Sequence, residues 1–148
     1  MKTLYISDMD GTLLAPGARL TPKTVEILQR LMEKGGYFTA ATARTLIGLN
    51  MLDLSGVDWT VPFVLGNGSM LYDVVRRRVV ETLDIAPETI RRILDICESY
   101  GKTPMLYQVH GHEVQGVTTG VTSEGERSFM EVRNARFPDC IRIVPAYE

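Results

Sequence analysis

The stretch Leu4-Tyr5-Ile6-Ser7-Asp8-Met9-Asp10-Gly11-Thr12 decides how the rest of the chain is interpreted. Its apolar start is typical of a short buried strand, and this strand ends in two carboxylates, one residue apart, ahead of a glycine turn. Folding gains little from two neighbouring acids, because like charges repel and their desolvation is costly. Two neighbouring carboxylates are far more useful in a site that holds a divalent cation and attacks a phosphoryl group. The stretch therefore indicates a Mg²⁺-dependent phosphohydrolase built around Asp8.

The residues that follow alternate between helix-like and strand-like patterns. Thr21 and Pro22 are typical of a helix start, with a hydroxyl at the N-cap and proline at the first helical position. Apolar residues continue at helical spacing to Met32, and Gly35-Gly36 ends the helix before a second strand over residues 37–41. A strand, a helix and a strand predict a right-handed βαβ unit, and therefore an α/β fold with a Rossmann-like parallel sheet.

Four more elements are predicted before residue 83. A second helix is expected over residues 46–54, and a third strand over residues 61–65. Segments 70–73 and 79–82 indicate a hairpin, with the three arginines of residues 76–78 at its solvated tip.

The sequence pattern changes near residue 83, where we expect a boundary between a core domain, residues 1–82, and a second domain, residues 83–148. An amphipathic helix is expected to start at Pro87 and to close at Gly101, with Cys97 on its apolar face and in the core. Alternating, glycine-rich segments then predict antiparallel strands. The second part therefore indicates the beginning of an α+β domain.

The three predicted parallel strands each end in a polar cluster. These clusters are Asp8/Asp10, Thr42/Arg44 and Asn67/Gly68. Ligands of open α/β sheets bind outside the carboxyl ends of the strands, so we expect the clusters to share one rim. Structural alternatives are an acidic turn for the aspartates, a helix N-cap for Thr42, a surface position for Arg44 and a plain turn for Asn67-Gly68.

Phosphoryl transfer needs a nucleophile, neutralisation of the phosphoryl oxygens and a proton for the leaving group. We expect Asp8 to be the nucleophile that forms an aspartyl-phosphate. Asp10, on the same side of an extended segment, is expected to be the acid and base. Mg²⁺ prefers hard oxygen ligands and is expected at Asp8 and Asp10, with a backbone carbonyl. Thr12 offers a hydroxyl and a backbone N–H to the phosphate.

The segment Asp8-Met9-Asp10-Gly11-Thr12-Leu13-Leu14 closely resembles the first signature of the haloacid dehalogenase-like (HAD) phosphatases. The second signature, a strand-terminal Thr or Ser that binds the phosphoryl group, is matched by Thr42, although Ala43 stands where Cof-type members often have glycine. Gly66-Asn67-Gly68 and the following hairpin resemble the same subgroup. The resemblance implies a small phosphomonoester substrate, such as a sugar phosphate or a phosphorylated cofactor, and a second domain that opens an α/β cap. The implied substrate-binding residues are Thr12, Thr42, Arg44, Asn67 and Gly68.

Two further signatures of that family have no match in the chain. They are a Lys that neutralises the phosphoryl group and an acidic pair that completes the Mg²⁺ site, both expected after the cap. We therefore expect an N-terminal portion of a longer protein or a truncated gene product. The first strand would then be an open apolar edge, which favours poor stability or pairing with the missing C-terminal half or another chain.

The composition disfavours several other classes of protein. The 148 residues are 45% hydrophobic and 23% charged, with a net charge of −2, as in ordinary globular proteins. The chain lacks the basic excess of a nucleic-acid binder, a signal-peptide pattern and an apolar stretch long enough for a bilayer. We expect a cytoplasmic protein with no nucleic-acid or membrane partner. His110 and His112 are expected to be surface residues rather than metal ligands.

Two other functions remain open. A non-catalytic fragment or pseudo-enzyme that binds Mg²⁺ and phosphate, or that pairs with a partner chain, would explain the unmatched signatures. A phospho-acceptor domain similar to a response regulator would also use an aspartate, although Asp10-Gly11-Thr12 fits that class less well.

Overall fold

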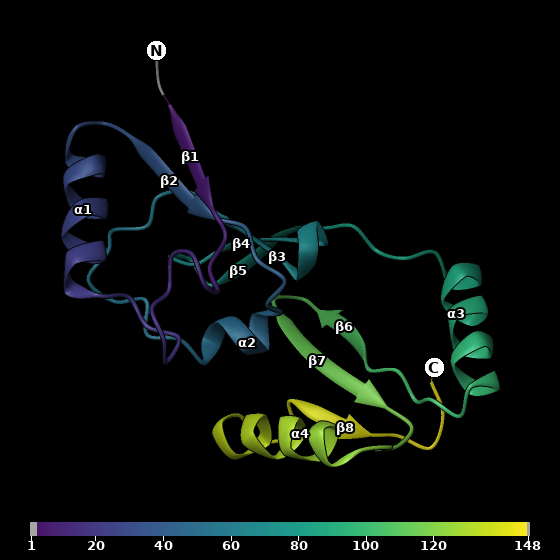
Figure 1. The fold of residues 1–148 in the computed structure, drawn as a ribbon. Helices are drawn as coiled ribbons and strands as arrows, with labels where there is room; N and C mark the ends of the chain where they lie inside the picture. Colours follow the sequence, from purple (N-terminus) through teal and green to yellow (C-terminus); the bar gives the residue numbers. More distant parts are fainter. Residues whose placement is uncertain (1–2, 148) are drawn as a thin grey trace. The chain divides into compact units, whose positions relative to one another are not determined.

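The computed structural model of the protein describes residues 3–147. The chain forms two compact units, Met1–Leu83 and Asp84–Glu148 (Figure 1). Among the described residues, no helix combines the length and apolar character that crossing a bilayer would require.

The first unit begins with the predicted βαβ arrangement. Strand β1 (Leu4–Ser7) pairs in parallel with β2 (Tyr37–Ala40), and helix α1 (Pro22–Glu33) connects them. The side chain of Thr21 caps α1 by accepting a 3.0 Å hydrogen bond from the N–H of Thr24, while Pro22 occupies the first turn. Helix α1 contacts β2 and buries Leu28. The helix-start signals and the glycine stop therefore predicted this helix correctly.

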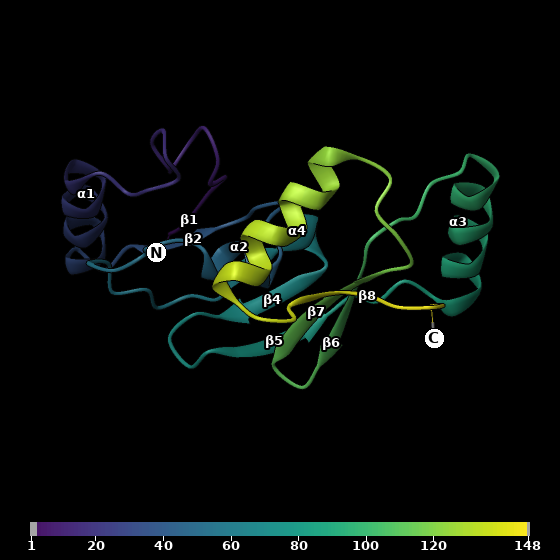
Figure 2. The same ribbon diagram turned by 90° about the horizontal axis from the view of Figure 1, so that it is seen from below.

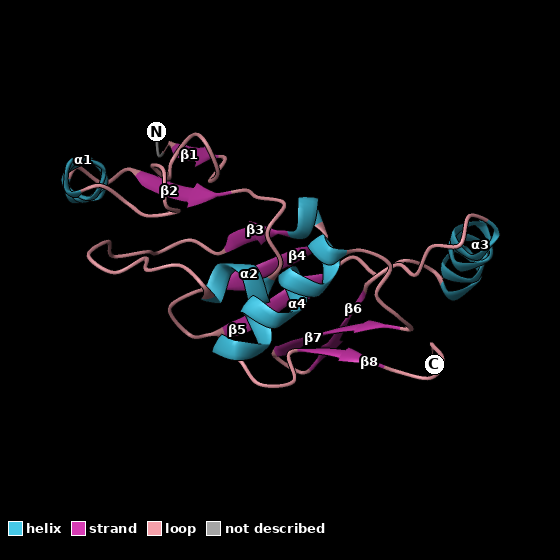
Figure 3. Ribbon diagram, turned by 60° about the horizontal axis from the view of Figure 1, so that its bottom comes forward, coloured by secondary structure: helices cyan, strands magenta, loops and turns pink. Residues whose placement is uncertain are grey.

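Three more strands follow in the first unit. Strands β3 (Phe63–Leu65), β4 (Met70–Asp73) and β5 (Arg78–Thr82) form an antiparallel sheet in which β4 is central (Figure 3). A parallel bridge between Ala41 and Val64 connects the end of β2 to β3. The predicted hairpin is confirmed. The third strand starts two residues later than predicted, because Pro62 cannot donate to a ladder and its carbonyl instead accepts a 2.6 Å hydrogen bond from Thr39.

The second helix is much shorter than predicted. Helix α2 spans only Leu46–Asn50, whereas the apolar pattern predicted residues 46–54. Beyond α2 the chain makes local bonds that compete with a helix, because the Asp53 carboxylate accepts from the N–H of Ser55 at 3.0 Å. The Leu54 carbonyl accepts from the indole N–H of Trp59, also at 3.0 Å. A glycine within α2 lowers its helical propensity further.

The core of the first unit explains how the aspartates are held. Met9, between Asp8 and Asp10, is fully buried, as are Phe63 and Leu65 of β3. Trp59 packs edge-on against Phe63, with ring centroids 4.8 Å apart. Burial of Met9 anchors the middle of the acidic stretch in the core, so both flanking carboxylates must point elsewhere.

The second unit combines two helices with one sheet. Helix α3 (Pro87–Ser99) precedes an antiparallel pair, β6 (Leu106–His110) and β7 (Glu113–Thr118). Helix α4 (Glu124–Arg136) then leads to β8 (Ile141–Ile143), which pairs in parallel with β7 (Figure 2). The prediction did not include α4, although its N-terminus carries a capping box in which Ser123 and Glu126 bond each other's backbone N–H.

Two residue-level predictions for this unit have different outcomes. Cys97 is half-buried and not in a core, because α3 has no buried residue and leaves Ile96 59% exposed and Tyr100 77% exposed. That prediction was wrong. His110 and His112 are exposed beside the β6–β7 turn, as predicted.

Candidate functional site

The acidic stretch leaves β1 as a turn rather than as an extended segment. The carbonyl of Asp8 accepts from the N–H of Leu13 at 3.3 Å, and the carbonyl of Met9 accepts from the N–H of Leu14 at 2.8 Å. Gly11 supplies the left-handed backbone of this turn, with φ of 75°. The stretch from Asp8 to Asp10 is therefore not the extended segment that was expected. Both aspartates are exposed on either side of the buried Met9, and their placement on one side stays a prediction.

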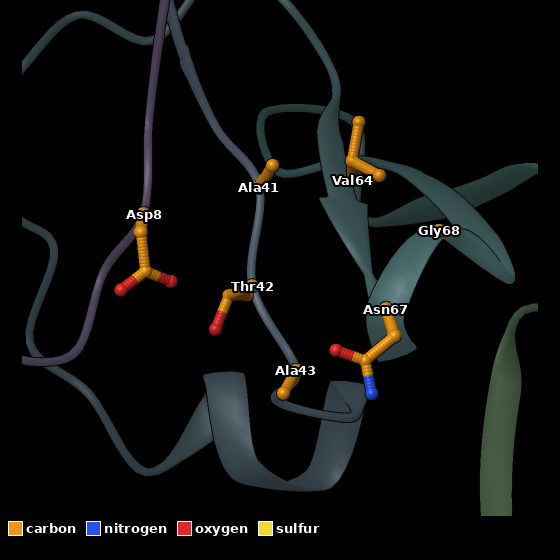
Figure 4. Close-up of a pocket in the computed structure, with 7 residues that line it drawn as sticks. All are labelled: Asp8, Ala41, Thr42, Ala43, Val64, Asn67 and Gly68. Carbon is orange, nitrogen blue, oxygen red and sulfur yellow. The ribbon is translucent and has the colours of Figure 1, made fainter.

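The ends of β1, β2 and β3 surround an open pocket of about 260 Å³ (Figure 4). The side chains of Asp8 and Thr42 both project into it, and the amide of Asn67 approaches from the η1 turn, Gly66–Gly68. Its lining residues are Asp8, Ala41, Thr42, Ala43, Val64, Asn67 and Gly68. The structure thus brings together Asp8 of the first polar cluster, Thr42 of the second, and both Asn67 and Gly68 of the third. Ala41, Ala43 and Val64 were not predicted, since small apolar residues carry no chemical signal.

Thr42 is held at the centre of this pocket by its backbone. Its N–H donates to Val64 at 2.9 Å, its carbonyl accepts from the N–H of Asn67 at 3.1 Å, and the residue is 5% exposed. The Oγ1 atom accepts from the N–H of Arg44 at 3.1 Å, so its hydroxyl hydrogen is oriented away from that bond. The helix N-cap alternative for Thr42 is wrong, because Thr45 caps α2 by accepting from Gly48.

Asn67 has an unusual backbone conformation. Its φ is 56°, in the left-handed region, between Gly66 and Gly68 with φ of 57° and 98°. Asn is one of the few residues with a side chain that tolerates this region, because its short amide can bond locally. The conformation directs the amide group toward the pocket (Figure 4), where it can donate or accept a hydrogen bond.

Asp10 and Arg44 form a two-point ion pair. The guanidinium Nε and Nη2 atoms donate to Oδ2 and Oδ1 of Asp10, each at 2.7 Å. These hydrogen bonds are the main cause of a pKa of Asp10 below its usual value, and desolvation by burial opposes them. Neither residue lines the pocket. No sequence signal predicted this pairing, because the two residues lie 34 positions apart.

Thr12 is not brought to the pocket. It is exposed, and its N–H donates to the Met9 carbonyl at 3.4 Å within the turn. As the structure has it, the predicted phosphate contact of Thr12 has no counterpart in the pocket lining.

The oxygen atoms at this rim are of the chemical type that binds Mg²⁺. The Asp8 carboxylate and backbone carbonyls are hard ligands of the type that Mg²⁺ selects. Within residues 3–147, however, no group of three or more His, Cys, Asp and Glu side chains could hold a metal together. The described residues therefore offer part of a ligand set.

The sequence matches the model of the haloacid dehalogenase-like hydrolase family over residues 5–136. It is 33% identical to the HMP-PP phosphatase of Enterobacter sp. (strain 638) over 94 residues, which is 64% of this chain and 34% of that protein. It is 28% identical to the pyridoxal phosphate phosphatase YbhA of Escherichia coli (strain K12) over 104 residues, 70% of this chain and 35% of the relative. The chain thus spans about a third of the length of these curated relatives.

The fold is also similar to solved structures. BT1666 of Bacteroides thetaiotaomicron, studied among the phosphatases of the HAD superfamily, matches with a TM-score of 0.71 and 19% identity. The match covers 97% of this chain and 49% of that structure. It supports the α/β fold with a parallel sheet.

Proposed function

The chain belongs to the haloacid dehalogenase-like hydrolase family, and from that premise we propose that it carries the nucleophile half of a Mg²⁺-dependent phosphohydrolase site. Its substrates are small phosphomonoesters, such as sugar phosphates or phosphorylated cofactors. The supporting observation is the meeting of Asp8, Thr42 and Asn67 in one open pocket (Figure 4). A carboxylate nucleophile there faces a hydroxyl and an amide that can bond phosphoryl oxygens.

In the first step, a carboxylate oxygen of Asp8 attacks the phosphorus atom and the bond to the leaving oxygen breaks. The product is an aspartyl-phosphate on Asp8 and an alcohol that takes a proton from Asp10. Thr42 donates its hydroxyl to a phosphoryl oxygen, and Asn67 donates its amide. The proton that Asp10 donates here is the one that it accepts from water in the second step of the preceding turnover.

In the second step, water attacks the phosphorus atom of the aspartyl-phosphate. Asp10 accepts a proton from this water, and the bond between phosphorus and the Asp8 oxygen breaks. Inorganic phosphate leaves, and Asp8 returns to its carboxylate form. The ion pair with Arg44 suits this half of the reaction, since it keeps Asp10 ionised as a base.

The carboxylates of Asp8 and Asp10 and a backbone carbonyl of the same stretch would be the ligands of Mg²⁺. When bound, it would neutralise negative charge on the phosphoryl oxygens. Residues 83–148 would form part of a cap domain that selects the leaving group and excludes water. Thr12, whose N–H donates to the Met9 carbonyl, would help to hold the acidic turn.

The experiment is phosphate release from p-nitrophenyl phosphate, with and without Mg²⁺. We expect turnover that needs Mg²⁺ and that Asp8→Asn abolishes, whereas the exposed Asp58→Asn retains it as the matched control. Turnover that survives Asp8→Asn would reject the nucleophile. A phosphorylated Asp8 that persists would instead favour a phospho-acceptor domain.

A second candidate is a non-catalytic module that binds Mg²⁺ and phosphate and is completed by another polypeptide. The observation that favours it is the pocket lining, which contains no cationic side chain among residues 3–147. Developing charge on a phosphoryl group needs such a cation. Calorimetry that detects Mg²⁺ and phosphate binding without turnover would select this function, and turnover by the chain alone would exclude it.

A further inference from the structure

Arg44 makes contact with all three strand ends that form the candidate site. Its side chain bonds Asp10 beyond β1, and its backbone N–H donates to Oγ1 of Thr42 at 3.1 Å beyond β2. Its carbonyl accepts from the N–H of Gly66, after β3, at 2.9 Å. One residue therefore connects the predicted acid, the predicted phosphate-binding hydroxyl and the turn that presents Asn67.

The guanidinium group is already engaged on three sides. Nε and Nη2 bind Asp10, and Nη1 donates to the carbonyl of Gly48 in α2 at 3.1 Å. The side chain is 22% exposed and does not line the pocket. Ala43, its neighbour, lines the pocket instead. The resemblance to phosphatases implies a substrate contact for Arg44, but in this geometry each guanidinium nitrogen already donates to a protein oxygen, outside the pocket lining.

We propose that Arg44 is a positioning residue, which fixes the Asp10 carboxylate relative to Thr42 and the Gly66 turn and does not bind the phosphoryl group. This inference rests on the proposed function. Arg44 acts through Asp10, whose orientation decides whether it can reach a leaving-group oxygen. The planar fork of arginine can bind both carboxylate oxygens and still donate to Gly48, which a lysine ammonium cannot do with the same directions.

The first test measures the position of Arg44 without any activity. In ¹⁵N-labelled protein, we expect Asp10→Asn to shift the Nε–H resonance of Arg44 and the amide resonances of Gly48 and Gly66. Asp8→Asn is the matched control and should leave the Arg44 Nε–H resonance in place. An Arg44 resonance that Asp10→Asn does not change would overturn the proposal.

The second test separates positioning from phosphate binding. We expect Arg44→Ala to lower kcat for p-nitrophenyl phosphate on the order of 10²-fold, as misplaced catalytic groups do, with KM within about twofold. The inhibition constant of inorganic phosphate should likewise stay within about twofold, and added guanidinium ion should restore part of kcat. Arg30→Ala, which removes an exposed ion pair on α1, is the matched control.

Failure of the inference about Arg44 can be told apart from failure of the proposed catalysis. A rise of tenfold or more in the phosphate inhibition constant of Arg44→Ala would make Arg44 a direct ligand and overturn the inference. Arg44→Lys tests the same point if the alanine variant does not fold, with lowered kcat and unchanged KM expected. If the unmodified chain shows no turnover, the proposed catalysis fails, while the resonance experiment still decides where Arg44 is held.

Discussion

The backbone N–H of Asn67 donates a 3.1 Å hydrogen bond to the carbonyl of Thr42, so two candidate phosphate-binding residues from neighbouring strand ends are tied to each other. The bond depends on the left-handed conformation of Asn67 between two glycines. The position of the amide in the pocket is therefore a property of the backbone as well as of the side chain.

Two substitutions at Asn67 separate the backbone from the amide. Asn67→Gly keeps the φ of 56° accessible and should leave unfolding free energy nearly unchanged, while phosphate affinity falls. Asn67→Ala also removes the amide but keeps a Cβ in the left-handed region, without the local bonding that lets asparagine adopt it, which costs up to roughly 1–2 kcal/mol. Urea unfolding and phosphate titration measure the two effects. Equal unfolding free energies of the two variants would contradict the expected cost of alanine in the left-handed region.

Met9 anchors the acidic stretch, and its truncation should destabilise the first unit. The side chain is fully buried, and replacing a buried Met by Ala typically costs about 2–5 kcal/mol. Met9→Leu conserves most of the volume and should cost less than about 1.5 kcal/mol. Met51→Ala, at a position 36% exposed, is the control. Chemical denaturation gives the comparison, and a Met9→Ala loss no larger than that of Met51→Ala would count against this anchor.

Asp73 should make stability depend on pH in the acid range. Its carboxylate accepts from the N–H groups of Arg76 and Val75, at 2.9 and 3.1 Å, and from the Arg76 guanidinium at 3.0 Å. The N–H bond from Arg76 is the main cause of a pKa below the usual value. A lowered folded pKa gives stability that is full above the unfolded pKa of about 3.9 and is lost as pH falls through the folded pKa.

The measurement is the urea midpoint between neutral pH and pH 3 for the unmodified chain and for Asp73→Asn. The variant should be less stable at neutral pH and should lose less stability on acidification. Exposed Asp58→Asn should follow the unmodified chain. Parallel pH curves for the unmodified chain and Asp73→Asn would show that these bonds do not favour the carboxylate.

The first strand should promote self-association. Leu4, Tyr5 and Ile6 are 48%, 49% and 61% exposed, and among the described strands β1 pairs only with β2. An exposed apolar edge pairs readily with other chains, and a charged residue weakens such pairing. Ile6→Lys should therefore reduce concentration-dependent association in sedimentation velocity, whereas Ile27→Lys on α1, which is 54% exposed at that position, should not. A monodisperse monomer of the unmodified chain with a cooperative thermal transition would refute the expectation.

Local signals in the sequence were sufficient for most elements of the first unit. The N-cap at Thr21, the proline at 22 and the glycine stop act over a few residues, and their effect does not depend on the rest of the fold. The hairpin of β4 and β5 follows from alternation in the same way. Helix α2 was overestimated, because the hydrogen bond from Trp59 to Leu54 depends on core packing.

Strand and turn patterns, which are local, were enough to place Asp8, Thr42 and Asn67 at strand ends, and parallel strands end at one rim. Folding was needed to establish that Asp8 lines the pocket while Asp10 binds Arg44, 34 residues away, at 2.7 Å. The burial of Met9 and the turn closed by Leu13 and Leu14 hold the acidic stretch where these contacts form. Contacts between distant residues form only once the chain has packed, and no local pattern encodes them.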